Sequence, residues 1–321
     1  MKKTLITIGI CIVAVSCLAL NIYVSLAYSV EDLNFENKGD IVVGPGKAEL
    51  FLSPGEKSTK EITISNRSGM KKRINIDVED FVASKDSGTT VDFLGKEKGR
   101  FSLKDYVKPE ITEIILEHGQ RLRLPVEIDI PLNADPGGLY GAVLISASNI
   151  TEPGSIEDNT ASMSAKLVTR VASLFFVRVK GDVNEDGALS DFRALKSFYE
   201  KGSIPFNIAY ENKGSVHESP YGIIEIRNLL GKKVDEVQVD PWFVMPDSIR
   251  TREVKWERGG LFGRYTASLT LNRGYKDILD TKEFSFWVIP WKLVLVGLAV
   301  LFLFIWLLVW IAGHFELKKK Q

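Results

Sequence analysis

The stretch "ITISNRSG", Ile62–Gly69, is the most informative of the chain, because its pattern returns far down the sequence as "IAYENKGS", Ile208–Ser215. In both stretches apolar residues alternate with others, and an Asn, a basic residue and a small-residue turn follow. Alternation at period two predicts a strand with one buried face. Asn tolerates left-handed backbone, and its side chain can close an Asx turn where the strand ends. The repeat therefore indicates that the chain builds the same kind of domain twice.

A second echo supports the first. "GLYGAVL" begins at Gly138 and "GRYTASL" begins at Gly263. In immunoglobulin-like sandwiches a Tyr near the start of a late strand can bond back to the backbone and fix a corner, which makes Tyr140 and Tyr265 corner candidates. The alternative is two ordinary half-buried aromatic residues. The first domain has about twenty more residues between its echoes than the second, and we expect the polar segment 83–103 to hold them as an inserted loop.

The rest of the chain between its two ends also alternates, for example in "LRLPVEIDI" and "INIDV". Pro-Gly and Gly-Gly pairs punctuate these runs as turns. Many short strands at hairpin spacing predict an all-β chain with two tandem immunoglobulin-like β-sandwiches, at 41–180 and 181–289. The apolar spacing in 189–199 also fits a helical face, but a first strand suits a sandwich better.

The N-terminal end, 1–29, has the layout of a secretory signal peptide, with lysines, a long apolar run and small residues at Ala27 and Ser29. The alternative is an uncleaved membrane anchor. The two cysteines of the chain, Cys11 and Cys17, both lie in this run. This placement excludes a disulfide-stapled scaffold and a zinc-cysteine fold for the rest of the chain.

The other end contains "LVLVGLAVLFLFIWLLVWIA", 293–312, which carries no charge and is long enough to span a bilayer. Trp287 and Trp291 precede it, where aromatic side chains favour the headgroup layer. A buried core helix would need a polar face, which this run lacks. The basic tail 313–321 follows, and by the positive-inside rule it is cytoplasmic. We therefore expect a single-pass protein of the cell membrane with the bulk of the chain extracytoplasmic.

One motif suggests a metal. "DVNEDG", Asp182–Gly187, has the spacing of a calcium loop, but the twelfth position, where such loops need a bidentate acid, is Arg193. The alternative is an acidic turn between the two sandwiches, since Asn, Asp and Gly are favoured in turns anyway. Calcium binding stays open at this point, and we expect no cofactor. Because the chain holds 41 acidic and 41 basic residues, its charge does not favour nucleic acid as a partner.

Residues for catalysis are hard to nominate. Ser68 and Lys71 match Ser-x-x-Lys, but they sit in a strand-ending turn and no Lys-Thr-Gly accompanies them. His118 and His217 lie in turns, where we expect them to be exposed. No Gly-x-Ser-x-Gly elbow, His-Glu-x-x-His or phosphate-binding loop occurs in the sequence. We therefore predict a protein that is not an enzyme, with no catalytic, cofactor-binding or metal-binding residue to name.

The whole layout resembles the WxL-interacting proteins of Gram-positive cell surfaces. The resemblance is carried by "LSPGEKSTKEITISNRSGMKKRINIDVEDF", by "FSLKDYV" and by "LRLPVEIDIPLNADPGGLYGAVLIS". It implies a signal, two sandwiches, one spanning helix and a basic tail, with peptidoglycan contacted by the first domain and partner proteins by the second. "VVGPGKAEL" stands where the family has Pro-Glu-Asn-Gln, so only the architecture and the broad role are carried over.

These features together predict a membrane-anchored bacterial surface protein for binding or adhesion. Its partners would be cell-wall polymer (peptidoglycan), surface proteins or both. An extended partner segment could add a strand to an exposed sheet edge, with the inserted loop supplying further contacts. The alternative is a membrane-tethered chaperone, or an accessory subunit of an envelope secretion or assembly machine.

Overall fold

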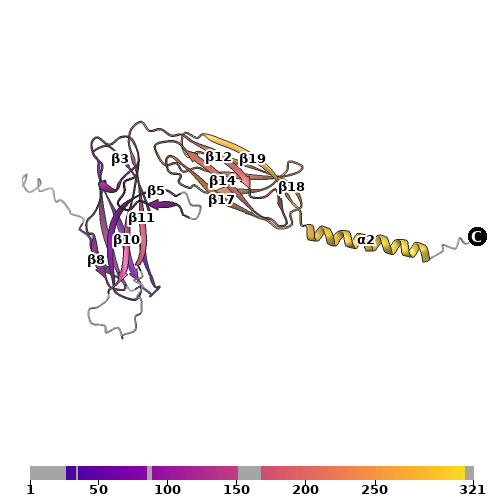
Figure 1. Ribbon diagram of the computed structural model, residues 1–321, viewed down its shortest axis with the longest axis horizontal. Helices are drawn as coiled ribbons and strands as arrows, with labels where there is room; N and C mark the ends of the chain where they lie inside the picture. Colours follow the sequence, from indigo (N-terminus) through magenta and orange to yellow (C-terminus); the bar gives the residue numbers. More distant parts are fainter. Residues whose placement is uncertain (1–26, 34, 85–88, 151–167, 315–321) are drawn as a thin grey trace, which may run out of the picture.

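The computed structural model describes residues 27–33, 35–84, 89–150 and 168–314. Nearly all of the predicted signal peptide and most of the basic tail lie outside the described residues. Two β-sandwiches follow each other along the chain, meet at an angle, and lead into one C-terminal helix (Figure 1). The predicted fold class, two tandem immunoglobulin-like sandwiches with a helix at the C-terminal end, is confirmed.

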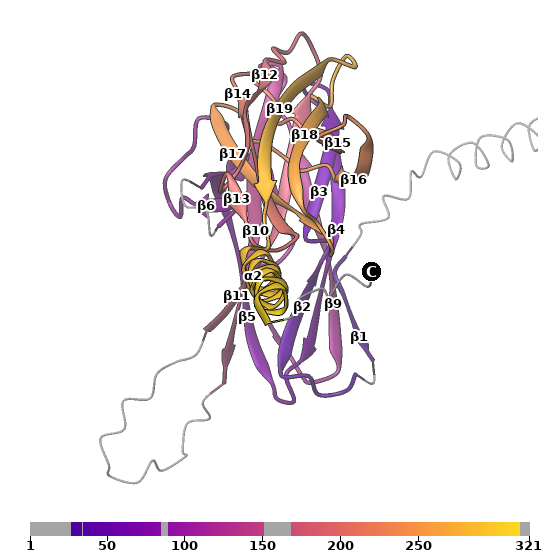
Figure 2. The ribbon, with the colours of Figure 1, turned by 90° about the vertical axis from the view of Figure 1, so that its right-hand side faces the viewer.

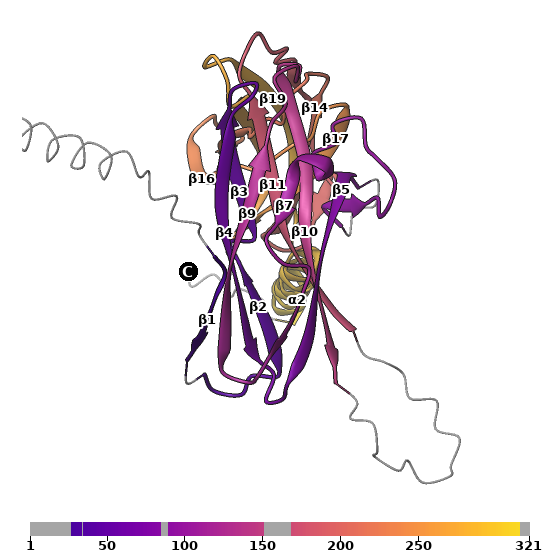
Figure 3. The same ribbon diagram turned by 90° about the vertical axis from the view of Figure 1, so that its left-hand side faces the viewer.

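The first sandwich holds β1 (Ser29–Asp32), β2 (Asp40–Gly44), β3 (Lys47–Leu52), β4 (Lys57–Arg67), β5 (Lys72–Ala83), β6 (Val91–Phe93), β7 (Val107–Pro109), β8 (Glu113–Leu116), β9 (Gln120–Asp129), β10 (Gly137–Asn149) and β11 (Val168–Val179). One sheet has the order β1-β9-β4-β2 with β7 beside β9, and the other has the order β3-β11-β10-β5-β6 with β8 beside β5. Figure 3 shows this sandwich from the side opposite the C-terminal helix. Because β1 pairs with β9, this sandwich begins before residue 41, inside the range predicted for the signal peptide.

The second sandwich holds β12 (Gly187–Ala194), β13 (Phe198–Tyr199), β14 (Ser203–Asn212), β15 (Tyr221–Asn228), β16 (Lys233–Val239), β17 (Ser248–Glu257), β18 (Gly263–Asn272) and β19 (Leu279–Val288). Its sheets have the orders β12-β14-β17 and β13-β19-β18-β15-β16. Figure 2 views it from the side of the C-terminal helix. The ambiguous segment 189–199 is strand rather than helix, because β12 finds a partner in β14.

The two sandwiches share one topology, which explains the sequence echoes. β4 pairs with β9 and β2, as β14 pairs with β17 and β12. β10 lies between β11 and β5, as β18 lies between β19 and β15. In each sandwich the last strand also pairs in parallel with an early one, β3 with β11 and β13 with β19. The repeated octet therefore marks β4 and β14, and the repeated Gly-x-Tyr marks β10 and β18.

Hydrophobic alternation builds each core as the sequence predicts. The residues on one face of the run at 122–130 are all fully buried: Leu122, Leu124, Val126, Ile128 and Ile130. Burying one such side chain is worth about 1.5–3 kcal/mol. The second core is richer in aromatic rings, and Phe206, Trp256 and Phe286 are among its fully buried or nearly fully buried members.

A buried Asn ends the repeated strand in both sandwiches. The Asn66 side chain donates to the carbonyl oxygens of Met70 and Leu116, both at 2.9 Å, and accepts from a backbone N–H two residues on. The Asn212 side chain donates to the carbonyl oxygens of Val216 at 2.8 Å and Val244 at 3.0 Å, and it also closes an Asx turn. Both side chains are fully buried, so each Asn satisfies backbone groups that water cannot reach.

The insertion at 83–103 is more ordered than a plain loop. β6 pairs back onto the end of β5, and a short 3₁₀ turn, η1 (Lys104–Tyr106), follows the insertion. Asp80, only 1% exposed, organises this segment. Its carboxylate accepts the backbone N–H groups of Leu103 at 3.0 Å, Lys104 at 2.9 Å and Gly99 at 3.2 Å. The prediction of a loop missed this hairpin, because nothing local in the sequence pairs Asp80 with amides twenty or so residues away.

The C-terminal helix, α2, spans Trp291–His314. Its segment Trp291–Ile311 is long and apolar enough to cross a membrane, and it is not buried against either sandwich. The helix therefore begins at Trp291, two residues before the predicted start at residue 293.

We predict that Asn212→Ala lowers the free energy of unfolding by about 2–4 kcal/mol, because two buried carbonyl groups and one amide lose their partner. Thermal unfolding of the full chain in detergent measures the effect. Asn207→Ala is the matched control, since Asn207 lies on the same strand, is half-buried and makes no side-chain hydrogen bond to the described residues. Equal melting temperatures for the two variants would contradict the role assigned to Asn212.

Candidate functional site: the groove between the two sandwiches

Aromatic rings from both sandwiches join at one place. This junction cluster consists of Phe81, Tyr140, Ala142, Phe176 and Met245, with Phe243 packed against it. The ring of Phe176 lies edge-on to that of Phe243, with centroids 4.9 Å apart, and Lys47 lies over both rings. Tilted and edge-on ring pairs of this kind stabilise beyond the area they bury. The cluster therefore holds the second sandwich on the first.

Tyr140 does not make the corner that the sequence suggests. Its hydroxyl accepts the backbone N–H of His217, in the second sandwich, at 2.6 Å. Tyr265, the equivalent residue of the second sandwich, does bond back locally, with its hydroxyl 3.3 Å from both the N and the O of Phe262. The corner prediction is therefore confirmed for Tyr265 and wrong for Tyr140. The prediction fails for Tyr140 because its hydroxyl lies against the second sandwich and bonds there instead of to the backbone of its own domain.

His217 is buried rather than exposed in its turn. Only 10% of its side chain is accessible, because its ring packs edge-on against Phe176 and Tyr140. Burial lowers the pKa of the imidazole to about 4, although Glu49 at 3.9 Å opposes that shift. His217 is therefore neutral at physiological pH and acts as part of the junction.

The next residue, Glu218, is a buried carboxyl group and is 5% exposed. It accepts a hydrogen bond of 2.6 Å from the hydroxyl of Tyr210, and its other oxygen, Oε1, has no partner among the described residues. Burial raises the pKa of Glu218 to about 7. Gly187, the glycine of the calcium-like motif, has to be Gly because a Cβ there would collide with this carboxylate and with Tyr210.

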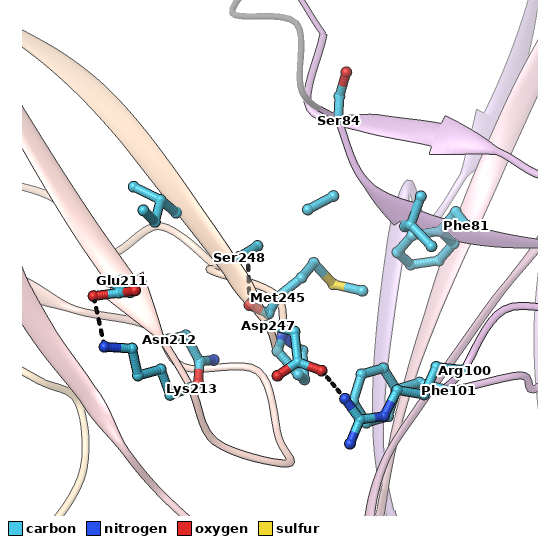
Figure 4. A pocket seen from close by; sticks show the side chains of 14 residues that line it. Phe81, Ser84, Arg100, Phe101, Glu211, Asn212, Lys213, Met245, Asp247 and Ser248 are labelled. Carbon is cyan, nitrogen blue, oxygen red and sulfur yellow. Dashed lines mark hydrogen bonds and ion pairs between the residues drawn. The ribbon is translucent and has the colours of Figure 1, made fainter.

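Beside the junction cluster lies an open groove of about 760 Å³, which we call the junction groove (Figure 4). Its walls come from the end of β5 and the insertion on one side, and from the turns around β14 and β17 on the other. Its lining residues are Phe81, Val82, Ala83, Ser84, Arg100, Phe101, Glu211, Asn212, Lys213, Met245, Pro246, Asp247, Ser248 and Ile249. The floor is apolar, and two ion pairs, Arg100 with Asp247 and Lys213 with Glu211, stand at its sides.

One side of the groove leads onto the free edge of a sheet. β17 pairs with β14, and its other edge pairs with no strand in the described part of the chain. Ile249, the second residue of β17, is 59% exposed where it lines the groove. Arg250 ties the strand to the insertion through Thr90 at 3.2 Å. The arrangement places an unpaired strand edge, an apolar floor and paired charges side by side.

The Ser-x-x-Lys match has a structural explanation. The hydroxyl of Ser68 bonds within its own turn, and Lys71 forms an ion pair with Glu117 at 2.7 Å. His118 accepts the backbone N–H of Gly69 at 3.1 Å. These side chains support the turn after β4, away from the groove.

The calcium-like segment Asp182–Gly187 joins the two sandwiches. Within it, Glu185 lies 2.7 Å from Arg178 and 3.6 Å from Lys276, so cations of the protein already surround that carboxylate. Among the described residues, no group of three or more His, Cys, Asp or Glu side chains could hold a metal ion. The geometry is that of an acidic turn between domains.

Comparison with solved structures finds neighbours of low sequence identity. No family model and no curated protein matches the chain. The class 5 fimbriae chaperone CfaA is 13% identical, with 78% of this chain and 100% of that chain covered and a TM-score of 0.36. The Pseudomonas aeruginosa chaperone CupB2 is 11% identical (75% and 98% covered, TM-score 0.34), and the E. coli chaperone DraB is 13% identical (77% and 96% covered, TM-score 0.33). At such identities and TM-scores, no partner or activity is transferred.

Sequence reasoning missed the junction groove. One sequence feature could have indicated it: "PWFVMPD", 241–247, is an apolar run without alternation that lies between two strands. Such a run in a connection needs a surface to cover it, and here the first sandwich covers Phe243 and Met245. A second signal is Ile249, an apolar residue at the start of a strongly charged strand.

We predict that His217 and Glu218, two buried neighbours, change the stability of the folded protein in opposite directions as pH rises. Between pH 4 and 6.5 the unfolded chain binds a proton at His217 that the folded chain does not, so this contribution to stability rises with pH. Between pH 4.5 and 7 the folded chain keeps a proton on Glu218 that the unfolded chain loses, so this contribution falls as pH rises.

Glu218→Gln should therefore gain stability relative to the parent protein as pH rises from 4.5 to 7, by up to about 3 kcal/mol, and then level off. Melting temperatures of both proteins across this range provide the measurement. Glu253→Gln, at an exposed position of β17, is the matched control for the loss of a carboxylate. A flat difference for Glu218→Gln would show that the carboxyl group is ionised in the folded protein.

Proposed function

We propose that this protein is a membrane-tethered binding protein that holds an extended polypeptide segment in the junction groove. The observation that carries the proposal is the edge of β17 that pairs with no described strand, beside an apolar floor. A free strand edge offers a row of main-chain donors and acceptors, and an added strand gains affinity from them. The alternate side chains of the bound segment would then enter the groove beside Ile249 and Met245.

The junction itself supports this proposal. A groove between two loosely connected domains would change shape as they move. Here the junction cluster and the hydrogen bond from His217 to Tyr140 hold the two walls in place. A preformed groove spares a partner the cost of ordering it, which favours binding.

The charges around the groove favour a protein segment over a polyanion. Arg100 and Lys213 each have an acidic partner, Asp247 and Glu211, so the lining carries both signs. A strongly anionic polymer would find as much repulsion as attraction there. A segment with apolar residues and a few polar groups fits better.

The alternative drawn from the sequence, a membrane-tethered chaperone or accessory subunit of an envelope machine, agrees with this proposal, because such a protein binds other polypeptides. Adhesion through peptidoglycan, the resemblance to WxL-interacting proteins and the extracytoplasmic placement of the sandwiches stay predictions. That the protein is not an enzyme is likewise part of the proposal.

The test uses the full chain in detergent to select short random peptides from a displayed library. We expect selected peptides with alternating apolar residues, and we expect Ile249→Asp to weaken their binding by about tenfold or more, since a buried anchor is typically worth at least 1.4 kcal/mol. Leu279→Asp is the matched control, because Leu279 is also 59% exposed but lies elsewhere on the second sandwich.

Two further outcomes decide between mechanisms. N-methylation of alternate peptide bonds in a selected peptide should abolish binding, because it removes the main-chain donors that pair with β17. Insoluble peptidoglycan sacculi form a parallel arm. The groove proposal would be wrong if no peptide is selected and if the protein is retained on sacculi equally well with and without Ile249→Asp. That result would favour binding to the cell wall.

A further inference from the structure

Exposed apolar side chains gather at one end of the second sandwich. Leu230 is 89% exposed, Leu229 and Phe262 are each 68% exposed, and three more side chains exceed a third. We call this set the helix-end patch; its members are Leu195, Phe198, Leu229, Leu230, Phe262 and Trp287. Single exposed apolar residues are ordinary, but several gathered at one end of a domain point to a binding surface.

Strand register places these residues at the same end. Gly263, next to Phe262, lies opposite Val288, and Trp287 lies opposite Phe198. The β15–β16 turn with its two leucines reaches the same level, because Asn228 lies opposite Tyr265. Three separate turns of the chain therefore present apolar side chains at one end of the sandwich.

The same end carries the helix α2, which leaves the second sandwich on the side away from the first (Figure 1). The connection is tight. Ile289 donates its N–H to the carbonyl oxygen of Tyr199 at 2.8 Å, and Lys292 pairs with Glu200 at 2.9 Å. A membrane crossed by α2 would therefore lie directly against the helix-end patch.

The chemistry of the patch suits a membrane surface. Trp, Phe and Leu are the residues that amphipathic surfaces bury at the boundary between headgroups and acyl chains. Lys196 and Lys232 lie in the same turns and form no ion pair with any described residue. Basic side chains beside an apolar surface add attraction to anionic lipid headgroups.

We propose that the helix-end patch inserts into the interfacial layer of the bilayer that α2 crosses, with anionic phospholipid as its ligand. The second sandwich would then keep a fixed orientation relative to the membrane instead of rotating freely about its connection to α2. With strands of ten residues, such as β18, this sandwich holds the junction groove roughly 30 Å above the surface. This inference goes beyond the proposed function and does not depend on any partner.

The test places a probe in the patch of the full chain. Cys11 and Cys17 are replaced by Ser, and a single Cys at Leu230 or Phe262 carries an environment-sensitive fluorophore. The protein is reconstituted in vesicles of phosphatidylcholine and phosphatidylglycerol that contain a lipid with a nitroxide near its headgroup. We expect quenching at both positions several times stronger than at Leu279→Cys, which is exposed to 59% but lies outside the patch.

Quenching at Leu230 and Phe262 no greater than at Leu279 would overturn the proposal. Cross-linking between copies through these cysteines, without quenching by the lipid, would assign the patch to self-association instead. A double variant, Leu230→Ser with Phe262→Ser, should keep its melting temperature, because both side chains are exposed. A fluorophore on Trp287→Cys should be quenched less by the nitroxide lipid in this double variant than in the protein with the intact patch. Peptide binding at Ile249 is measured separately, so failure of either proposal leaves the other standing.

Discussion

The hydrogen bond from the backbone N–H of His217 to the hydroxyl of Tyr140 is the contact on which the arrangement of the molecule depends. It lies among aromatic rings, with Tyr140 and Phe176 on one side and Phe243 on the other. A buried hydroxyl and a buried amide that lost each other would leave two unsatisfied polar groups in an apolar place. Together with the hydrogen bond from the N–H of Gly138 to the carbonyl oxygen of Ser215 at 2.8 Å and the ion pair of Arg100 with Asp247, this bond favours one angle between the two sandwiches.

The same sequence element serves two purposes in this chain. In the second sandwich, the tyrosine hydroxyl of β18 bonds to its own backbone at Phe262. In the first sandwich, the tyrosine of β10 bonds to the neighbouring domain. A repeated domain can thus be joined to its copy by redirecting one side chain of a shared motif. The groove is a consequence, because a fixed angle leaves a hollow between the insertion and the start of β17.

The two proposed binding surfaces lie at opposite ends of the second sandwich. One end meets the first sandwich and contributes Met245, Asp247 and Ile249 to the groove. The other end carries the helix-end patch and α2. Strands of ten residues separate these ends, so a partner in the groove and a membrane at the patch would not compete for space. On the two proposals together, the second sandwich is a spacer that also forms half of a binding site.

Local pattern is enough to predict the fold class, the repeat and the apolar C-terminal helix that is long enough to span a membrane. Alternation, the Asn-ended strand and the charge-free run near the C-terminus are each read within one segment, and the burial of Asn66 and Asn212 confirms the reading. The groove, the burial of His217 and the partner of Tyr140 become visible only in the folded molecule. Those features join residues some 77 positions apart, from different domains. A turn histidine or an edge isoleucine has the same local sequence whether or not another domain covers it, so only the packing of the two sandwiches can distinguish the cases.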